Sequence, residues 1–291
     1  MSLTKLDHLR DLLRSYGSCL VAYSGGVDSV FLAVVAHQVL GDKFLAVIAD
    51  SPSLARREFK DAVEIAKQFG FPLHIIKTRE FSNAEYVANP HNRCYFCKHD
   101  LFSELLPIAK EKSHAVIIWG ENASDVGDYR PGAQAASEVQ ARAPLKEAGL
   151  TKAEIRAYSA QLGLPTADKP QAACLSSRIP YGEPVTPEKL AMIEAAEYVL
   201  HDLGFHDVRV RHHELPAAGK KVPLARIEVG SAEMPKFLQN NTYATVASAF
   251  KEQGYTHVTL DLAGYKRGGF NEIIGKTPTQ STTNHERIQH Q

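Results

Sequence analysis

Residues 19–30 have the sequence CLVAYSGGVDSV, in which an apolar run leads directly into a pair of glycines and the start of a helix. The glycines allow the backbone to approach an anion closely, while the helix N-terminus and two serine hydroxyls supply hydrogen-bond donors. The string is neither the Walker sequence nor the three-glycine dinucleotide pattern. It predicts a phosphate-binding loop, with an ordinary strand-to-helix turn as the alternative. The residues assigned to the phosphates are Ser24, Gly25, Gly26, Asp28 and Ser29, and Asp28 is also expected to position magnesium.

Apolar runs alternate with helix-period stretches through the first half of the chain. The runs cover residues 19–23, 44–50, 72–78 and 115–122. The stretches between them, which carry apolar residues at helical intervals, are residues 28–40, 54–69 and 98–112. Because the runs are continuously apolar, they predict strands that are covered on both faces. The expected fold class is α/β, with a doubly wound, mostly parallel sheet.

A second, smaller unit is expected in the last third of the chain. Thr151 and Glu154 form a capping box that begins a helix ending near Gly163. After the proline-rich run at residues 180–184 the pattern changes to that of a small α+β domain. Its elements are predicted as a helix at 187–203, strands at 208–214 and 224–229, a helix at 232–253 and a strand at 257–262. The predicted domains are 1–182 and 183–275, followed by a polar, disordered tail at 276–291.

The composition is that of a globular protein without a membrane segment. Hydrophobic residues make up 44% of the chain and charged residues 23%, and no apolar run approaches the roughly 18 residues that a span requires. The amphipathic N-terminus lacks the apolar core of a secretory signal, which predicts a cytoplasmic protein. The chain has 33 Lys and Arg residues and 33 Asp and Glu residues, so its net charge does not favour nucleic acid as a partner.

Four cysteines occur in a chain that is expected to stay in a reducing compartment, so no disulfide framework is predicted. Cys19 lies inside an apolar run and is expected in the core. Cys174 lies in a loop beside Arg178, whose charge favours the thiolate, the form that attacks electrophiles. An inert thiol is the alternative for a lone cysteine.

The SGGVDS string resembles the loop of the PP-loop ATP pyrophosphatases, and the resemblance covers about the first 180 residues. It implies ATP and Mg²⁺ as cofactors, cleavage of ATP between the α and β phosphates, and an adenylated intermediate. A carboxylate is a poor electrophile. Its conversion to an acyl-adenylate gives it a good leaving group before the nucleophile arrives. By the same resemblance, Asp50 and Ser51 at the end of the second predicted strand contact adenosine.

Three further strings resemble the LarE family of ATP-dependent sulfur transferases, namely ACLSSRIPYG at 173–182, DYRPG at 128–132 and VRVR at 208–211. The resemblance implies a small-molecule substrate, a pyridinium biscarboxylic acid mononucleotide, whose carboxylates become thiocarboxylates in the nickel-pincer cofactor of lactate racemase. Cys174 aligns with the sulfur-donating cysteine, which in sacrificial members is left as dehydroalanine. The family also implies a homo-oligomer, a hexamer.

The CYFC string at Cys94 and Cys97 departs from the single-cysteine pattern of the family. Two thiols at this spacing, just before the helix expected from Lys98, suit one metal centre. With Cys174 and no evident fourth ligand, they suit a 4Fe-4S cluster with one open iron, an arrangement that some three-cysteine members resemble. The alternatives are a redox disulfide, solvent-facing thiols without a role, and a zinc site completed by His91 or His99.

A basic strand is expected to hold the phosphate of the substrate. Arg209, Arg211 and His213 share one face of a strand because side chains alternate, and two guanidiniums on one face can fork onto a phosphate. A solvated face paired with neighbouring glutamates is the alternative. By resemblance, the residues assigned to the substrate phosphate are Arg209, Arg211, Lys98 and Arg178, with Glu197 and Glu228 nearby as candidate metal ligands. Asp128 and Arg130 are assigned to the same pocket.

Three other functions are compatible with the same loop. A tRNA thiolase would need a broad basic surface or an added RNA-binding module, which the balanced charge does not favour. An amidotransferase-like synthetase would leave Cys174 dispensable, and a nucleotide-binding regulator would bind ATP without releasing pyrophosphate. The expectation from the sequence is that the loop domain binds ATP and magnesium, the second domain binds the mononucleotide phosphate, and Cys174 delivers sulfur between them.

Overall fold

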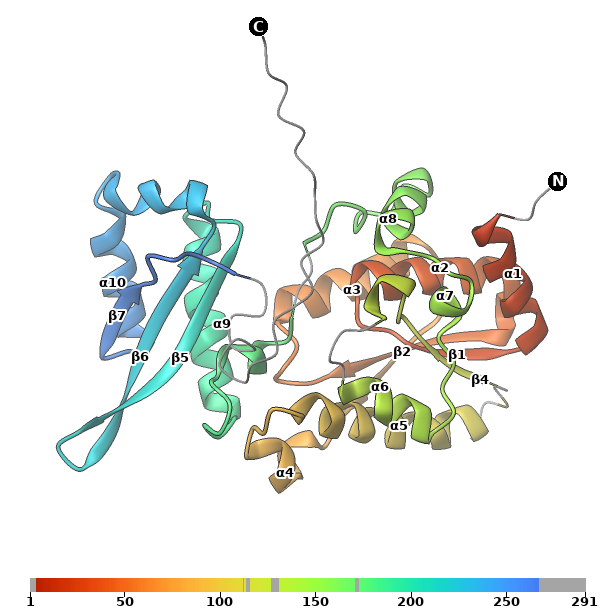
Figure 1. Cartoon of the computed structure of the whole chain (residues 1–291), viewed down its shortest axis with the longest axis horizontal. Coiled ribbons are helices and arrows are strands. Elements are labelled where there is room, and N and C mark those ends of the chain that lie inside the picture. Colours follow the sequence, from red (N-terminus) through yellow and green to blue (C-terminus); the bar gives the residue numbers. More distant parts are fainter. Residues whose placement is uncertain (1–3, 112, 114–115, 127–130, 171–172, 267–291) are drawn as a thin grey trace, which may run out of the picture.

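Four parallel strands form the central sheet of the N-terminal half of the chain (Figure 1). The structure is a computed structural model that describes residues 4–266 except 112, 114–115, 127–130 and 171–172. The strands lie in the order β3-β2-β1-β4 and comprise β1 (Cys19–Ala22), β2 (Phe44–Asp50), β3 (Leu73–Lys77) and β4 (Val116–Trp119). Each corresponds to a predicted apolar run.

Helices cover both faces of this sheet (Figure 1). One face carries α1 (Lys5–Tyr16), α2 (Val27–Leu40), α3 (Arg56–Gln68), α7 (Pro144–Glu147) and α8 (Lys152–Gln161). The opposite face carries α5 (Arg93–Glu111) and α6 (Pro131–Glu138). Along β1, Cys19 and Val21 pack against the first group, and Leu20 and Ala22 against the second. This confirms the predicted doubly wound α/β fold, and we call the unit the N-terminal lobe.

Short helices connect these elements. They are η1 (Gly41–Lys43), η2 (Glu80–Ser82), α4 (Ala84–Val87), η3 (Ala123–Asp125) and η4 (Leu175–Arg178). The predicted capping box at the start of α8 is present, because the Thr151 hydroxyl accepts from the Glu154 N–H and the Glu154 carboxylate accepts from the Thr151 N–H.

A mixed three-stranded sheet in the order β5-β6-β7 forms the C-terminal lobe, in which β6 pairs antiparallel with β5 and parallel with β7. The elements are α9 (Pro187–Asp202), β5 (Val208–Ala217), β6 (Lys220–Val229), η5 (Ser231–Leu238), α10 (Thr242–Glu252) and β7 (His257–Leu260). Val208 and Val210 pack into a core with α9 and α10, as predicted. Because side chains alternate, Arg209 and Arg211 lie on the other face.

Two predicted helices differ from the observed ones. The helix expected at 232–253 is broken between η5 and α10 by Asn240 and Asn241, whose φ angles of 49° and 59° are left-handed. The helix expected from Lys98 already begins at Arg93, so the CYFC string forms its first turn rather than preceding it. The predicted tail at 276–291 lies outside the described residues. Within the described part of the chain, no helix has the length and apolarity to cross a membrane.

Candidate functional site

The glycine pair between β1 and α2 forms a tight loop that can hold an anion. Gly25 has a φ of +73°, and a Cβ added there would lie 2.5 Å from the Cβ of Ala62 in α3, so the position requires glycine. Gly26 is the N-cap of α2 and has no side chain to cap the helix, which leaves the N–H groups of the first turn for a ligand. The Ser29 hydroxyl donates to the Gly26 carbonyl at 3.0 Å and accepts from the Ser24 N–H at 3.2 Å. These bonds close the loop.

A cavity of about 320 Å³, which we call the loop cavity, lies against this turn. Its walls come from the carboxyl ends of β1, β2 and β3, from α5 and from the segment before η4. The predicted site residues that line it are Ser24, Gly26, Asp28, Ser51, Cys97, Lys98 and Cys174. The fold therefore brings the phosphate loop and Cys174 to one cavity. Gly25, Ser29, Asp50 and Cys94 are not among its lining residues.

Asp28 lies in the first turn of α2 and faces a lysine that the sequence did not single out. Its Oδ2 accepts from Lys152 Nζ at 2.7 Å, and its Oδ1 is buried without a hydrogen-bond partner in the described structure. A buried carboxylate oxygen of this kind fits a magnesium ligand. Lys152 also lines the loop cavity, where its charge can offset that of a phosphate.

The end of β2 is held rigidly beside the loop. Asp50 forms an ion pair with Arg56, whose Nη2 donates to the carbonyls of Ser51 at 2.7 Å and Leu54 at 2.9 Å. The Ser51 hydroxyl is buried and contacts Glu80. Asp50 is thus engaged in shaping the turn, and Ser51 is the member of this predicted pair that reaches the cavity.

Of the three cysteines outside the core, Cys97 and Cys174 line the loop cavity. Cys94 and Cys97 lie in the first turn of α5, Cys174 is the N-cap of η4, and all three are free thiols. Although Cys94 is open to solvent on one side, burial by surrounding atoms raises its pKa and that of Cys97. The charge of Cys174 adds to the rise of both pKa values, while the charge of Lys98 opposes it. Cys19 is fully buried, as predicted.

No trio of His, Cys, Asp or Glu side chains among the described residues is close enough together to hold a single metal ion. A zinc site needs its ligands around one point, so the geometry gives no support to the zinc alternative with His91 or His99.

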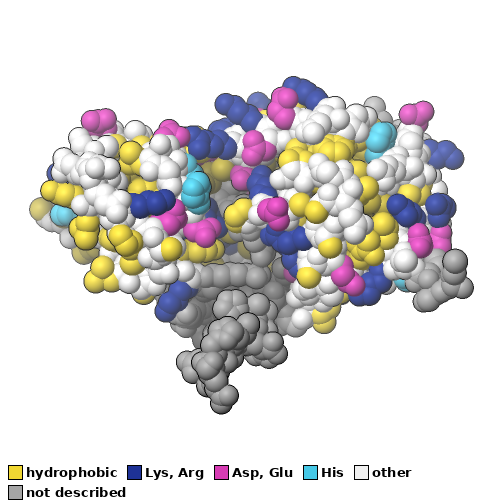
Figure 2. Space-filling view, turned by 90° about the horizontal axis from the view of Figure 1, so that it is seen from above, with side chains coloured by type: hydrophobic (Ala, Val, Ile, Leu, Met, Phe, Trp, Pro, Cys, Tyr) yellow, Lys and Arg dark blue, Asp and Glu magenta, His cyan; other side chains and the backbone are white. Residues whose placement is uncertain are grey.

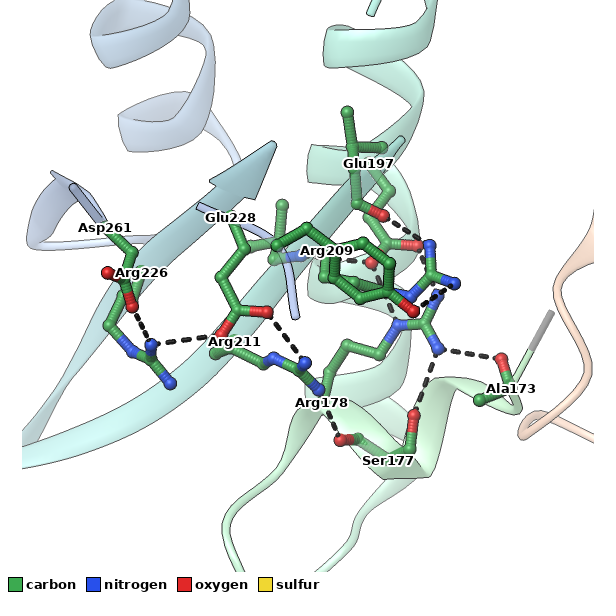
Figure 3. A network of polar contacts seen from close by, with 12 residues as sticks. Ala173, Ser177, Arg178, Glu197, Arg209, Arg211, Arg226, Glu228 and Asp261 are labelled. Atoms are coloured by element: carbon green, nitrogen blue, oxygen red, sulfur yellow. Dashed lines mark hydrogen bonds and ion pairs between the residues drawn. The ribbon is translucent and has the colours of Figure 1, made fainter. Parts of the chain in front are cut away.

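Arg178 holds the segment that carries Cys174 (Figure 3). Its Nε and Nη2 donate to the two oxygens of Glu197 in α9 at 2.9 and 3.0 Å. Its Nη1 donates to the carbonyls of Ala173 at 2.7 Å and Cys174 at 3.1 Å. All three nitrogens of this predicted phosphate ligand are therefore engaged within the protein, and the ion pair is almost completely buried.

Arg211 is engaged in the same way in the C-terminal lobe (Figure 3). It pairs with Glu228 at 2.7 Å and donates to the Ser177 carbonyl at 2.9 Å. Glu228 also pairs with Arg226 at 3.0 Å, and Arg226 with Asp261. Glu197 and Glu228 are both ion-paired with guanidiniums, and their assignment as metal ligands stays a prediction.

A second cavity of about 270 Å³, which we call the interlobe cavity, lies between α3, α9 and the start of β5. Its basic lining residues are Arg57, Lys169, Arg178 and Arg209, and carboxylates such as Asp61 and Glu194 lie among them. Lys169, Pro170 and Ala173 line both cavities, so the two adjoin beside the Cys174 segment. Arg211 does not line it.

Arg209 faces the interlobe cavity, with its guanidinium 4.7 Å from the centre of the Tyr265 ring. Burial lowers its pKa, and the neighbouring charge of Arg178 lowers it further. A guanidinium next to another cation in a buried setting favours the arrival of an anion. Asp128 and Arg130, assigned to the same pocket from the sequence, lie outside the described residues.

Sequence reasoning missed Lys152, Lys169 and Glu80, which all line the loop cavity. Lys152 had a usable signal, because a lysine in the first turn of a capped helix is opposed by the helix dipole and calls for another explanation. Lys169 pairs with Glu58 at 2.6 Å, a contact between segments that are distant along the chain and carry no shared motif.

Comparisons with known proteins find relatives that are similar over most of the chain. The profile of the NAD synthase family matches residues 4–98, which contain the phosphate loop. An uncharacterized protein of Synechocystis sp. is 43% identical over 94% of this chain and 99% of its own length. The pyridinium-3,5-bisthiocarboxylic acid mononucleotide synthase of Lactiplantibacillus plantarum is 35% identical over 94% of each chain. A glutamine-hydrolysing GMP synthase polypeptide of Methanococcus maripaludis is 27% identical over 63% of each chain.

Proposed function

This chain belongs to the LarE family of PP-loop proteins, and on that premise we propose that it is an ATP-dependent sulfur transferase acting on pyridinium-3,5-biscarboxylic acid mononucleotide. The enzyme adenylates the two carboxylates and converts them to thiocarboxylates in the synthesis of the nickel-pincer nucleotide of lactate racemase. The observation that carries the proposal is the meeting of the phosphate loop and Cys174 in one cavity.

The first half of the proposed reaction takes place at the loop. A substrate carboxylate attacks the α-phosphorus of ATP, which forms an acyl-adenylate and releases pyrophosphate. The N–H groups at the start of α2 and the loop serines hold the phosphates, and Lys98 and Lys152 offset their charge. Asp28 is the residue that would hold Mg²⁺, which neutralises phosphate charge when bound.

The second half delivers sulfur from the cysteine side of the cavity. The Cys174 thiolate displaces AMP from the acyl-adenylate and forms a thioester. Loss of the Cys174 α-proton with cleavage of its Cβ–S bond then leaves the thiocarboxylate on the substrate and dehydroalanine in the chain. Arg178 fixes the carbonyls on either side of this residue, which orients the sulfur.

A 4Fe-4S cluster held by Cys94, Cys97 and Cys174 is the alternative sulfur source within this proposal. Cys97 and Cys174 both line the loop cavity, and Cys94 lies three residues before Cys97 in α5, a spacing suited to one metal centre. Such a cluster would present an additional sulfide, taken from a donor outside the chain, which would replace AMP on the acyl-adenylate. The cysteines would then be unchanged after turnover.

We assign the acceptor to the interlobe cavity, with Arg209 toward its phosphate. A cavity of about 270 Å³ suits a mononucleotide better than a polynucleotide. Positive and negative side chains are interspersed on the face shown in Figure 2, without the broad basic surface that a tRNA thiolase would need. We further propose domains at 1–182 and 183–275, a cytoplasmic location from the character of the N-terminus, and a homohexamer from family membership.

Pyrophosphate release tests the adenylation. Purified protein with ATP, Mg²⁺ and the pyridinium biscarboxylate mononucleotide should release pyrophosphate, and omission of the mononucleotide should abolish the release. Cys174→Ala should still release pyrophosphate but lower thiocarboxylate formation by about 10³-fold or more, because it removes the sulfur carrier. Cys19→Ala is the matched control for loss of a thiol outside the cavity. Thiocarboxylate formation by Cys174→Ala at the rate of the unaltered protein would refute the role of this residue.

Intact mass spectrometry after turnover, with an anaerobic iron and sulfide assay, separates the two sulfur sources. Loss of one H₂S from the chain mass supports the sacrificial cysteine. An unchanged mass with bound iron and sulfide and repeated turnover supports the cluster. Absence of pyrophosphate release under all conditions would sink the proposed function as a whole.

A further inference from the structure

Two residues that line the loop cavity each carry a buried side-chain oxygen without a hydrogen-bond partner among the described residues. The two atoms are Oγ1 of Thr78, which directly follows β3, and Oε2 of Glu80. Glu80 is only 1% exposed, and a buried carboxylate oxygen without a partner costs free energy. The position of Glu80 in a cavity wall therefore points to a ligand that supplies the missing hydrogen bonds.

The Glu80 carboxylate is held in one orientation. Its other oxygen, Oε1, accepts from the hydroxyls of Ser51 and Ser53. Ser53 lies 3.1 Å from the Tyr86 hydroxyl, which lies 2.7 Å from the Ser176 hydroxyl. This buried chain of hydroxyls fixes Oε1, while Oε2 has no partner in the described structure, an arrangement typical of a preorganised binding group.

The position of Thr78 and Glu80 relative to the phosphate loop indicates which part of a bound nucleotide lies near them. The phosphate loop follows β1, and Thr78 follows β3, which is separated from β1 by β2. Two strand spacings amount to about 10 Å. A nucleotide whose phosphates occupy the loop reaches across this span with its sugar.

We propose that Thr78 and Glu80 form a subsite for the vicinal hydroxyls of a ribose. Two adjacent hydroxyls can donate to the Glu80 carboxylate and exchange a hydrogen bond with the Thr78 hydroxyl, whereas an anion would be repelled by the carboxylate. A carboxylate at a strand end recognises ribose hydroxyls in other nucleotide-binding sheets. The proposal rests on the proposed function for the identity of the nucleotides, ATP and the acceptor mononucleotide, each of which carries a ribose.

The test is calorimetric binding to the full chain with Mg²⁺. In one arm the ligands are ATP, 2′-deoxy-ATP and 3′-deoxy-ATP, and in the other nicotinic acid mononucleotide and its 2′-deoxy form. Losing a hydrogen bond to a charged group predicts that at least one deoxy ligand binds about 10- to 100-fold more weakly than its ribose parent. The arm in which the preference appears identifies the nucleotide whose sugar occupies the subsite.

Glu80→Gln should reduce that preference to less than about 3-fold while ATP still binds, because the amide presents a weaker acceptor. Glu85→Gln, on the exposed face of the adjacent α4, should keep the full preference. Equal binding of ribose and deoxy ligands in both arms, or an equal loss for all ligands in Glu80→Gln, would overturn the subsite. If Glu80→Gln does not fold, the ribose preference of the unaltered chain decides. A failed function appears differently, as ATP binding without any pyrophosphate release.

Discussion

Gly25 shows how a single missing side chain couples the phosphate loop to α3. Its positive φ and the 2.5 Å approach to Ala62 both exclude a Cβ. We expect Gly25→Ala to lower the free energy of unfolding by about 2 kcal/mol and to weaken ATP binding, because the loop must move away from α3. Gly26→Ala is the matched control, since its Cβ would find its nearest atom at 3.5 Å and its φ is −79°. Its free energy of unfolding should change by less than about 1 kcal/mol. Urea unfolding of the two variants measures the difference, and equal losses would exclude the steric cause.

His212 makes the stability of the C-terminal lobe dependent on pH. It is 2% exposed, and burial, followed by the charge of Lys189, lowers its pKa to about 4. In the unfolded chain its pKa returns to about 6.5, so the unfolded state binds more protons between these values. The free energy of unfolding should therefore fall by up to about 3 kcal/mol as the pH drops through this window.

Urea unfolding at a series of pH values checks this expectation. His212→Gln should flatten the pH dependence between about pH 4 and 6.5, whereas His206→Gln, at an exposed position, should leave it unchanged. A His212→Gln curve parallel to that of the unaltered protein would assign the effect to other groups, such as His213, whose pKa burial also lowers.

At the scale of elements, the N-terminus of α8 links helix capping to the phosphate site. Thr151 caps the helix with Glu154, and the next residue, Lys152, pairs with Asp28. Thr151→Ala should lower the free energy of unfolding by about 1 kcal/mol and weaken binding of Mg²⁺-ATP, because the first turn that carries Lys152 frays. Thr151→Ser keeps the hydroxyl and should retain both properties. Chemical denaturation measures the stability and calorimetric titration measures the ATP affinity. An unaltered ATP affinity in Thr151→Ala would show that the helix cap does not influence the phosphate site.

The elements that the sequence predicted well have local causes. β1 and β2 are continuous apolar runs, and the α8 cap is a four-residue pattern. The phosphate loop is likewise local. The break between η5 and α10 depends on two left-handed asparagines in an otherwise periodic stretch, so periodicity alone gave one helix.

The parts of the candidate site that depend on tertiary convergence were not predictable. Glu80 follows β3 and meets Ser51 after β2 only because the two strands are neighbours in the sheet. Arg178 looked like a free cation beside a cysteine, whereas its pairing with Glu197 requires the packing of α9 against η4. Neither contact has a sequence signal.

At the scale of the whole molecule, the two lobes are joined by more than a linker. The N-terminus of α3 docks on α9, where the Arg57 N–H donates to the Tyr198 hydroxyl at 2.9 Å and the Arg57 guanidinium lies over the same ring. A hydrophobic cluster also spans the junction, and its buried members are Tyr86, Leu175, Ile179, Val185, Leu190 and Ile193. Because the interlobe cavity lies at this junction and adjoins the loop cavity, the integrity of the junction bears on the proposed chemistry as well as on stability.

Asn89 is the polar residue that fastens this junction. It is fully buried with a φ of 55°, and its Nδ2 donates to the carbonyls of Ile179, Pro180 and Glu183. Its Oδ1 accepts from Arg93. Asn89→Ala removes these four hydrogen bonds and should lower the free energy of unfolding by about 3 kcal/mol.

The loss should also uncouple the lobes. We expect one calorimetric transition for the unaltered protein and a broadened or divided transition for Asn89→Ala. The reason is that residues 179–183, which connect the cores of the two lobes, lose their hydrogen bonds to the Asn89 side chain. Asn83→Ala removes only the cap of α4 and should lower stability by about 1 kcal/mol within a single transition. A single, equally sharp transition in Asn89→Ala would mean that the α3–α9 contacts alone hold the lobes together, in which case Tyr198→Phe should divide the transition instead.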